Sequence, residues 1–430
     1  MISKSNLLKL VLMVAFVVSL MTSFYLFTYK DTIAQEPLTH WWAVQSIDTM
    51  KYSRDVAREK LNDPVFNKEI DLQVKNIANT GATHVAIGTP YDDEFTPFLA
   101  RWVKAARKYN LNVWFRGNFS GWEGWFNYPK ISREEHLVKL EKYILSNPNL
   151  FEDGDIFTTC TECENGGPGD PRFTRDIVGY RKFLVDEYKT ASTSFNKIGK
   201  NVSSNYFSMN GDVANLIMDP ETTKSLNGIV VIDHYVGTAE KLAGDIKKLA
   251  EKSGGKIILG EMGVPIPDIH GKLNDEEQAK WLSDALRLIS IEPGLIGLNY
   301  WTATGSSTSL WNNDGSAKDA ANVLRGFYKA PVLEGNVVNE LGNIITNAKI
   351  SYLDKVATSD LSGKFRMLNI PSVETLIVQA DGYGKREINV DELENNPKIV
   401  LIKERENIFF KLAKKLKLLF ETAQLEFRLR

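Results

Sequence analysis

The sequence predicts an α/β fold, a (β/α)8 TIM barrel, followed by a small all-β sandwich. The chain has 430 residues, too many for one ordinary domain, with 43 % hydrophobic and 25 % charged residues. Short apolar runs alternate with helical patterns across residues 36–329, and this alternation stops near Ala330. Eight such pairs within about 290 residues favour a closed barrel over an open sheet.

The first 35 residues are expected to form a signal anchor and a linker. Lys4 and Lys9 precede an uncharged apolar run, Leu10–Phe27, whose length suits a retained transmembrane helix or a cleaved signal peptide. A buried core helix is the third alternative. Basic residues before the run place the bulk of the chain outside the cytoplasm. We therefore expect a single-pass protein of the cell membrane, or a secreted one if the segment is cleaved.

Eight runs are expected to form the barrel strands, because parallel strands buried on both faces are short and continuously apolar. They cover residues 43–47, 83–88, 111–115, 155–160, 200–207, 228–233, 256–259 and 295–301. The helices that follow them are expected at residues 66–79, 95–109, 133–145, 172–190, 212–218, 239–252, 275–289 and 316–328. Ser132 is placed to cap the third helix.

Residues 330–403 have a different pattern, with short strands, turn signals and no helical period. The strands are expected at residues 332–338, 348–353, 363–368, 375–380, 385–390 and 398–402. This pattern predicts a β-sandwich of about 70 residues. The tail, residues 404–430, is basic and amphipathic, so we expect a helix that lies on an anionic membrane surface or a partner, or packs on its own protein.

The charge and the cysteine content exclude several classes of function. The net charge is −2, so no global field would draw the chain to nucleic acid. The two cysteines, Cys160 and Cys163, are too few for a structural zinc site, and neither metal nor cofactor is expected. A local disulfide, two free thiols and a redox pair all remain possible for them.

The candidate catalytic residues are two glutamates that follow predicted strands. Catalytic side chains of such barrels project from the C-terminal strand ends, where Glu162 follows the fourth strand and Glu261 the seventh. Cleavage of a glycosidic bond needs a protonated carboxyl that donates to the leaving oxygen and an ionised one that attacks the anomeric carbon. Each charge raises the proton affinity of the other carboxyl, which helps to keep one of them protonated.

Further residues at the same rim are expected to bind a carbohydrate substrate. Aromatic faces stack on sugar rings, Arg116 would lower the pKa of a nearby carboxylate, and Tyr235 would hydrogen-bond the nucleophile. The predicted substrate-binding residues are Arg116, Trp122, Trp125, His234, Tyr235 and Trp301. In the loop after the first strand, Lys51 or Arg54 would contact an acidic or heavily hydroxylated glycan, unless this is a plain surface loop.

The constellation resembles the clan A retaining glycoside hydrolases that include family 5 cellulases and mannanases. The resemblance covers residues 40–328 and implies that Glu261, in Gly260-Glu261-Met262-Gly263, is the nucleophile. His234-Tyr235 and Trp301 resemble residues that the family has after strands 6 and 8. The acid/base position falls on Glu162, with Glu164 as the alternative.

One departure from the family pattern keeps a second function open. Thr161 stands where the family has the Asn that handles the sugar 2-hydroxyl. The implied activity is retaining hydrolysis of a β-linked polysaccharide or oligosaccharide. The alternative is a catalytically degenerate protein on the same barrel that binds glycan or serves as a scaffold.

The C-terminal segment resembles the carboxypeptidase regulatory-like, transthyretin-like domain. The matching residues include Gly335-Asn336-Val337-Val338, Asn369-Ile370-Pro371 and Ala380-Asp381-Gly382-Tyr383. The resemblance implies an accessory domain without catalysis, which acts as a spacer or a binding module.

Overall fold

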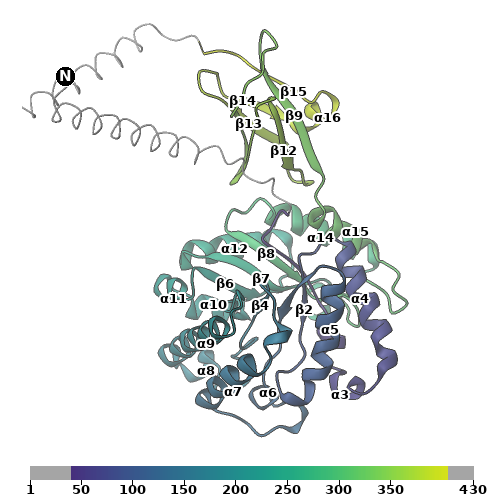
Figure 1. The fold of residues 1–430 in the computed structure, drawn as a ribbon, viewed down its shortest axis with the longest axis vertical. Coiled ribbons are helices and arrows are strands. Elements are labelled where there is room, and N and C mark those ends of the chain that lie inside the picture. Colours follow the sequence, from purple (N-terminus) through teal and green to yellow (C-terminus); the bar gives the residue numbers. More distant parts are fainter. Residues whose placement is uncertain (1–39, 405–430) are drawn as a thin grey trace, which may run out of the picture. The chain divides into compact units, whose positions relative to one another are not determined.

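The computed structural model describes residues 40–404 (Figure 1), and these residues form two compact units. One unit holds residues up to 331 together with 368–373, and the other holds 332–367 and 374–404. The predicted signal anchor and the tail beyond residue 404 lie outside the described residues. Within residues 40–404, no helix is both long and apolar enough to span a membrane.

The first unit is the predicted (β/α)8 barrel. Its strands are β1 (Val44–Asp48), β2 (His84–Ile87), β3 (Asn112–Phe115), β4 (Ile156–Phe157), β5 (Ser208–Asn210), β6 (Ile229–Asp233), β7 (Lys256–Met262) and β8 (Leu295–Tyr300). They pair in parallel in the order β4-β3-β2-β1-β8-β7-β6-β5. Ser203, just before β5, closes the ring, because its carbonyl accepts a 2.8 Å hydrogen bond from the amide of Phe157 on β4.

Helices surround the barrel strands, as Figure 1 shows. The longer helices are α4 (Asn67–Asn79), α5 (Thr96–Lys108), α7 (Arg133–Ser146), α9 (Ile177–Lys197), α10 (Gly211–Ile217), α12 (Ala239–Ser253), α14 (Asp275–Ile289) and α15 (Asp319–Tyr328). The shorter ones are α2 (Met50–Ser53), α3 (Ala57–Lys60), α6 (Ser120–Glu123), α8 (Pro171–Thr174), α11 (Pro220–Ser225) and α13 (Pro267–His270). Ser132 caps α7 as predicted, in a reciprocal capping box with Glu135.

Several predicted elements have different bounds in the structure, and three of these differences are in the segments around β4 and β5. The fourth strand ends at Phe157 instead of residue 160, because the chain leaves the sheet to form the loop that carries Cys160 and Cys163, which are joined by a disulfide. The fifth strand begins at Ser208 instead of residue 200. The helix predicted at 172–190 is divided into α8 and α9, because Arg175 has a left-handed conformation (φ 59°) between them.

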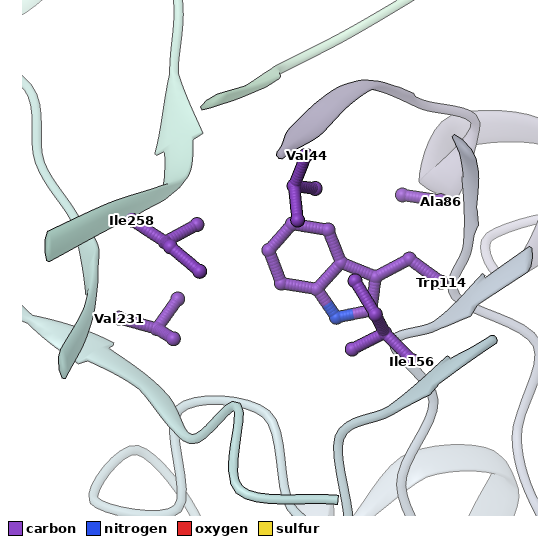
Figure 2. Packing of buried hydrophobic residues seen from close by; sticks show 6 residues of the cluster. All are labelled: Val44, Ala86, Trp114, Ile156, Val231 and Ile258. Atoms are coloured by element: carbon purple, nitrogen blue, oxygen red, sulfur yellow. The ribbon is translucent and has the colours of Figure 1, made fainter. Parts of the chain in front are cut away.

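An apolar cluster fills the barrel interior around Trp114 of β3. Its partners come from five other strands, and Figure 2 shows them facing the indole ring from several sides. The cluster consists of Val44, Ala86, Trp114, Ile156, Val231 and Ile258. Trp114 is fully buried, and its indole nitrogen donates a 2.9 Å hydrogen bond to the hydroxyl of Thr158. Because apolar side chains fill the barrel interior, a site for polar chemistry is expected at the strand ends.

The second unit contains two β-sheets. Its strands are β9 (Val332–Asn339), β10 (Lys349–Tyr352), β11 (Lys355–Thr358), β12 (Lys364–Leu368), β13 (Thr375–Gln379), β14 (Arg386–Asn389) and β15 (Lys398–Leu401). One sheet has the order β11-β10-β13-β14 and the other β12-β9-β15. The expectation of no helix here was wrong, because Val390–Asn395 forms the short helix α16, whose N-terminus is capped by Asn389.

Replacement of Trp114 should destabilise the barrel strongly. We expect Trp114→Ala to lower the free energy of unfolding by about 3–5 kcal/mol, because it removes a large buried side chain and leaves a cavity. Urea denaturation provides the measurement. Val138→Ala on α7, a side chain that is 70 % exposed, is the control and should change stability by less than about 0.5 kcal/mol. Equal effects of the two substitutions would contradict the assigned core.

Candidate active site

Glu261 lies near the C-terminal end of β7, with two donors facing its carboxylate. Oε1 accepts a 3.0 Å hydrogen bond from Arg116, and Oε2 accepts a 2.8 Å hydrogen bond from the hydroxyl of Tyr235. Burial raises the pKa of Tyr235, with a further contribution from Glu261, so the phenol stays a neutral donor. The two donors hold the carboxyl group of Glu261 in one orientation.

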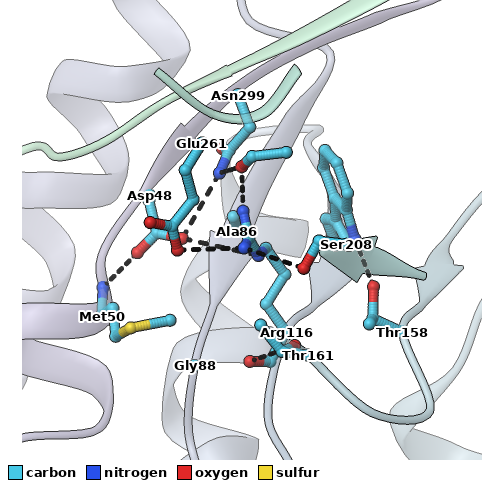
Figure 3. Close-up of polar contacts among 12 residues, drawn as sticks. Asp48, Met50, Ala86, Gly88, Arg116, Thr158, Thr161, Ser208, Glu261 and Asn299 are labelled. Atoms are coloured by element: carbon cyan, nitrogen blue, oxygen red, sulfur yellow. Dashed lines mark hydrogen bonds and ion pairs between the residues drawn. The ribbon is translucent and has the colours of Figure 1, made fainter. Parts of the chain in front are cut away.

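Arg116, at the end of β3, connects the barrel strands beneath this carboxylate (Figure 3). Its guanidinium is fully buried and donates to the carbonyl of Gly260 on β7. It also reaches Asp233 of β6 at 3.1 Å and the hydroxyl of Ser208 on β5 at 3.3 Å. Burial by itself would lower the pKa of Arg116, but the surrounding carboxylates outweigh it and raise that pKa. The structure thus places Arg116 beside Glu261, and because its side chain is fully buried it contacts the carboxyl cluster and not the open rim.

Two further buried carboxyls share this one cation. Asp48, at the end of β1, lies 3.9 Å from Arg116 and accepts a hydrogen bond from Asn299 of β8. Burial raises the pKa of Asp48 to about 6 and that of Asp233 well above its usual range, with Glu261 adding to both shifts. Three ionised carboxylates around one guanidinium would leave an excess of buried charge, which is costly. The raised pKa values of Asp48 and Asp233 are the electrostatic response to that excess.

Glu162 lies in the loop after β4 in a different environment. Its backbone has a left-handed conformation (φ 43°), and its amide donates a 3.0 Å hydrogen bond to the carbonyl of Ser208. The pKa of Glu162 is raised to about 8, first by burial and then by the charges of Glu261 and Glu164. Glu162 follows β4 and Glu261 lies near the end of β7, so both are at the C-terminal end of the barrel. Among residues 40–404, no side chain hydrogen-bonds the Glu162 carboxyl, which leaves its proton available.

The alternative acid/base, Glu164, is occupied by structural hydrogen bonds. Its carboxylate accepts from the amide of Asn210 at 2.6 Å, from the Asn210 side chain at 3.0 Å and from the Tyr180 hydroxyl at 3.2 Å. Glu164 is 3 % exposed, whereas Glu162 is only half-buried. The geometry therefore favours Glu162 over Glu164 as the group that reaches a substrate.

Trp301 and Tyr235 lie together beside Glu261. Their ring centroids are 6.2 Å apart in an edge-to-face arrangement, and Trp301 is partly exposed. The carbonyl oxygen of Trp301 would lie 2.0 Å from a Cβ at residue 263. Glycine is therefore required at this position, directly after β7. The structure thus brings Trp301 to the mouth as the sequence predicted.

Trp122 is not a sugar platform, which corrects the prediction. It is 3 % exposed, stacks on Phe183 of α9 at 5.1 Å and donates a hydrogen bond to the carbonyl of Cys163. A Cβ on Gly167 would lie 2.2 Å from the indole ring. The indole therefore supports the loop that carries Glu162 from below, because the aromatic packing of α9 covers its face.

Trp125 and His234 differ from each other in position. Trp125 is partly exposed at the rim, with the guanidinium of Arg54 4.9 Å from its ring centroid. His234 does not face the mouth, which corrects its assignment to substrate binding. Its Nε2 is 2.9 Å from Asp245 on α12, so the imidazole points to the helix layer. His234 directly follows β6, where successive side chains point to opposite faces of the sheet.

Several residues of the site were not singled out from the sequence. Asp48 and Asp233 end their strands, so the strand-end rule that identified Glu261 would also have found them. Asn299 lies inside β8 and gave no local signal. Glu123 of α6 accepts a 2.5 Å hydrogen bond from Asn118, and burial raises its pKa to about 7. Its approach to the mouth depends on the fold of the loop after β3.

The chemistry of this mouth suits proton transfer and nucleophilic attack. It offers one oriented carboxylate, one carboxyl with a raised pKa and an aromatic face. Within residues 40–404, no group of three or more His, Cys, Asp or Glu side chains is arranged to hold a metal ion. The guanidinium of Arg116 occupies the centre of the acidic cluster instead.

Comparison with known proteins finds solved structures that share the barrel fold. No family model matches the chain, and no curated protein matches it in sequence. The structure of GH5_18 from Bifidobacterium longum subsp. longum matches with 15 % identity and a TM-score of 0.50, over 70 % of this chain and 85 % of that chain. A beta-glycosidase, BGL167, matches with 12 % identity and a TM-score of 0.46, over 68 % and 97 %. At this level of identity the likeness establishes the fold alone.

The raised pKa of Glu162 predicts that Glu162→Gln stabilises the protein at neutral pH. Between the usual glutamate pKa and about 8, the folded state holds a proton that the unfolded chain has lost, so stability falls as pH rises through that window. An uncharged amide removes this loss. We expect a gain on the order of 1–3 kcal/mol at pH 7.5 and little change near pH 4, measured by urea denaturation at both values.

Glu261→Gln is the matched control for this substitution. It removes the charge that Arg116 and Tyr235 bind, so it should destabilise the protein at pH 7.5. Stability changes of the same sign in the two variants at pH 7.5 would contradict the conclusion that the two glutamates have opposite environments.

Proposed function

We propose that this chain is a retaining glycoside hydrolase that cleaves a β-linked polysaccharide or oligosaccharide. Glu162 is the acid/base and Glu261 is the nucleophile. The observation that carries the proposal is the contrast between the two carboxyls, since Glu261 receives two donors and Glu162 receives none from residues 40–404. The glycosidase fold of the barrel supports it.

The first step of the proposed reaction forms a glycosyl ester. One carboxylate oxygen of Glu261 attacks the anomeric carbon while the other oxygen keeps its own hydrogen-bond donor, and the bond to the leaving oxygen breaks. Glu162 gives its proton to that oxygen, so the aglycone leaves as a neutral alcohol. Tyr235 and Arg116 hold the nucleophile in line for this attack.

The second step uses the electrostatic coupling of the two glutamates. Esterification removes the negative charge of Glu261, which is one of the causes that raise the pKa of Glu162. The pKa of Glu162 therefore falls in the intermediate, so Glu162 stays ionised and accepts a proton from water. The hydroxide attacks the same anomeric carbon and frees Glu261, which gives net retention of configuration.

One observation favours the rival function, a glycan-binding protein with little or no catalysis. The hydroxyl of Thr161 donates to the carbonyl oxygens of Arg116 at 3.1 Å and of Gly117 at 3.4 Å. It is therefore committed to β3 and does not replace the amide that the resembled family directs to the sugar 2-hydroxyl. Sugar binding without turnover of any glycan would support this rival.

The proposal extends to the position of the enzyme in the cell. Residues 1–35 would anchor the chain in the cell membrane with the barrel outside the cytoplasm, and residues 404–430 would add a contact with the membrane. The disulfide between Cys160 and Cys163 is consistent with an oxidising compartment. The second unit would serve as a carboxypeptidase regulatory-like spacer or binding module.

Substitution of either glutamate should abolish turnover of β-glycosides in distinguishable ways. We expect Glu261→Gln and Glu162→Gln to lower kcat/KM by at least about 10³-fold on β-glucan, mannan or xylan and on aryl glycosides with poor leaving groups. Azide should restore turnover in Glu162→Ala and give a β-glycosyl azide, because the vacated acid/base site admits the anion. Full activity of the Glu261 variant would refute the mechanism.

The pH dependence of kcat/KM should report the acid form of Glu162. We expect activity to fall above about pH 8, because the ionised carboxyl has no proton to donate. Initial rates from pH 4 to 10 provide the profile. A dinitrophenyl leaving group needs little protonation, so the loss of the glycosylation rate above pH 8 should be smaller with it. An equal loss would contradict the assignment of Glu162 as the acid.

A further inference from the structure

We infer that the substrate carries a carboxylate at or next to the cleaved sugar, which Lys51 and Arg54 recognise. This inference rests on the proposed function and names the substrate class as uronic-acid glycosides. Its structural basis is a pair of cations, Lys51 on α2 and Arg54 directly after it, in the segment that follows β1 at the C-terminal end of the barrel, on the same side as the two glutamates.

The position of α2 is set by hydrogen bonds to the barrel strands. The amide of Met50 donates to the carboxyl of Asp48, which belongs to the buried acidic cluster. Thr49 donates through its hydroxyl to the carbonyl of Ala86 at 2.7 Å, and the hydroxyl of Ser53 accepts from the amide of Gly88 at 2.9 Å. Because this turn is fixed to β1 and β2, the two cations project from a defined part of the rim.

Both cations lie against the aromatic residues of the mouth. The ammonium of Lys51 is 5.6 Å from the ring centroid of Trp301, and the guanidinium of Arg54 is 4.9 Å from that of Trp125. Trp301 contacts Tyr235, which in turn hydrogen-bonds the nucleophile. A sugar that stacks on Trp301 would therefore meet Lys51 at its edge, within one residue of the cleaved bond.

Asp55 demonstrates that the two cations can hold one carboxylate together. Its Oδ2 is 2.9 Å from Lys51, and its Oδ1 is 2.8 Å from both Nε and Nη2 of Arg54. The side chains of all three residues remain between 25 % and 32 % exposed. Exposed ion pairs of this kind contribute little stability, so a substrate carboxylate can exchange with Asp55 at small cost.

The charges in the mouth explain why an anionic sugar would need these two cations. The Glu261 carboxylate lies in this mouth beside Tyr235, so an anionic sugar would be repelled there without compensation. A neutral glycan would gain nothing from two cations and one aspartate at the rim. Two charges against the single charge of Asp55 leave one net positive charge, which matches one sugar carboxylate.

The test compares matched aryl glycosides that differ only at C6. Each pair consists of a 4-nitrophenyl β-hexuronide and the corresponding β-hexoside, in the gluco, galacto and manno configurations. We expect the protein to prefer the uronide of the configuration that it accepts. Lys51→Met and Arg54→Met should each lower kcat/KM for that uronide by about 10- to 100-fold, the range of a charge-assisted hydrogen bond, and change the hexoside rate less than about threefold.

Lys280→Met on α14 is the control, because Lys280 forms an i,i+4 ion pair with Asp284 as Lys51 does with Asp55, and it is 76 % exposed. It should leave both rates unchanged. Equal or better turnover of the hexosides by the unaltered protein would overturn the inference and leave the proposed function standing. A uronide preference that survives both substitutions would also overturn it.

Binding separates this inference from a failure of the proposed function. If no glycoside is hydrolysed, the proposed function fails, and titration calorimetry with methyl β-hexuronides and methyl β-hexosides decides the inference. Binding of uronides that is weakened by Lys51→Met and by added salt would support the carboxylate site. Equal affinity for acidic and neutral sugars would refute it.

Discussion

The buried guanidinium of Arg116 is the group on which the geometry of the mouth depends. It joins β3 to β5, β6 and β7 and contacts Glu261 and Asp233 directly. A barrel that gathers carboxyls at its strand ends must offset their mutual repulsion in a region from which water is largely excluded. One cation with several donors does this while it also orients the Glu261 carboxylate. The remaining excess of negative charge helps to raise the pKa of the neighbouring Asp48 and Asp233.

The two glutamates differ because they belong to different kinds of backbone. Glu261 lies inside a strand, and the residues that follow β3 and β6, Arg116 and Tyr235, supply its donors. Glu162 lies in a loop with a left-handed backbone, next to the Cys160–Cys163 disulfide and above Trp122. The backbone fixes its position. Burial and the nearby negative charges raise the pKa of its carboxyl group and so favour the protonated form. The roles proposed for the two glutamates, acid and nucleophile, depend on this difference in environment.

The aromatic residues show the same dependence on context. Trp122 and Trp125 are three residues apart, yet the first is packed against Phe183 and supports a loop, whereas the second is at the rim beside Arg54. Trp301 reaches the mouth because it directly follows β8. In a barrel, the end of a strand is a reliable guide to the mouth, and a position within a loop is not.

The sequence by itself determined the barrel, most of its helices and the strand-end residues Glu162, Glu261, Tyr235 and Trp301. These follow from local periodicity and from the rule that C-terminal strand ends meet at one face. Only the tertiary structure decided that Trp122 and His234 face the protein interior and the helix layer, that Glu164 is occupied by Asn210 and Tyr180, and that Asp48 and Asp233 share Arg116. Burial, charge coupling and the direction of a loop side chain depend on neighbours that are distant in the chain, and local sequence carries no record of those neighbours.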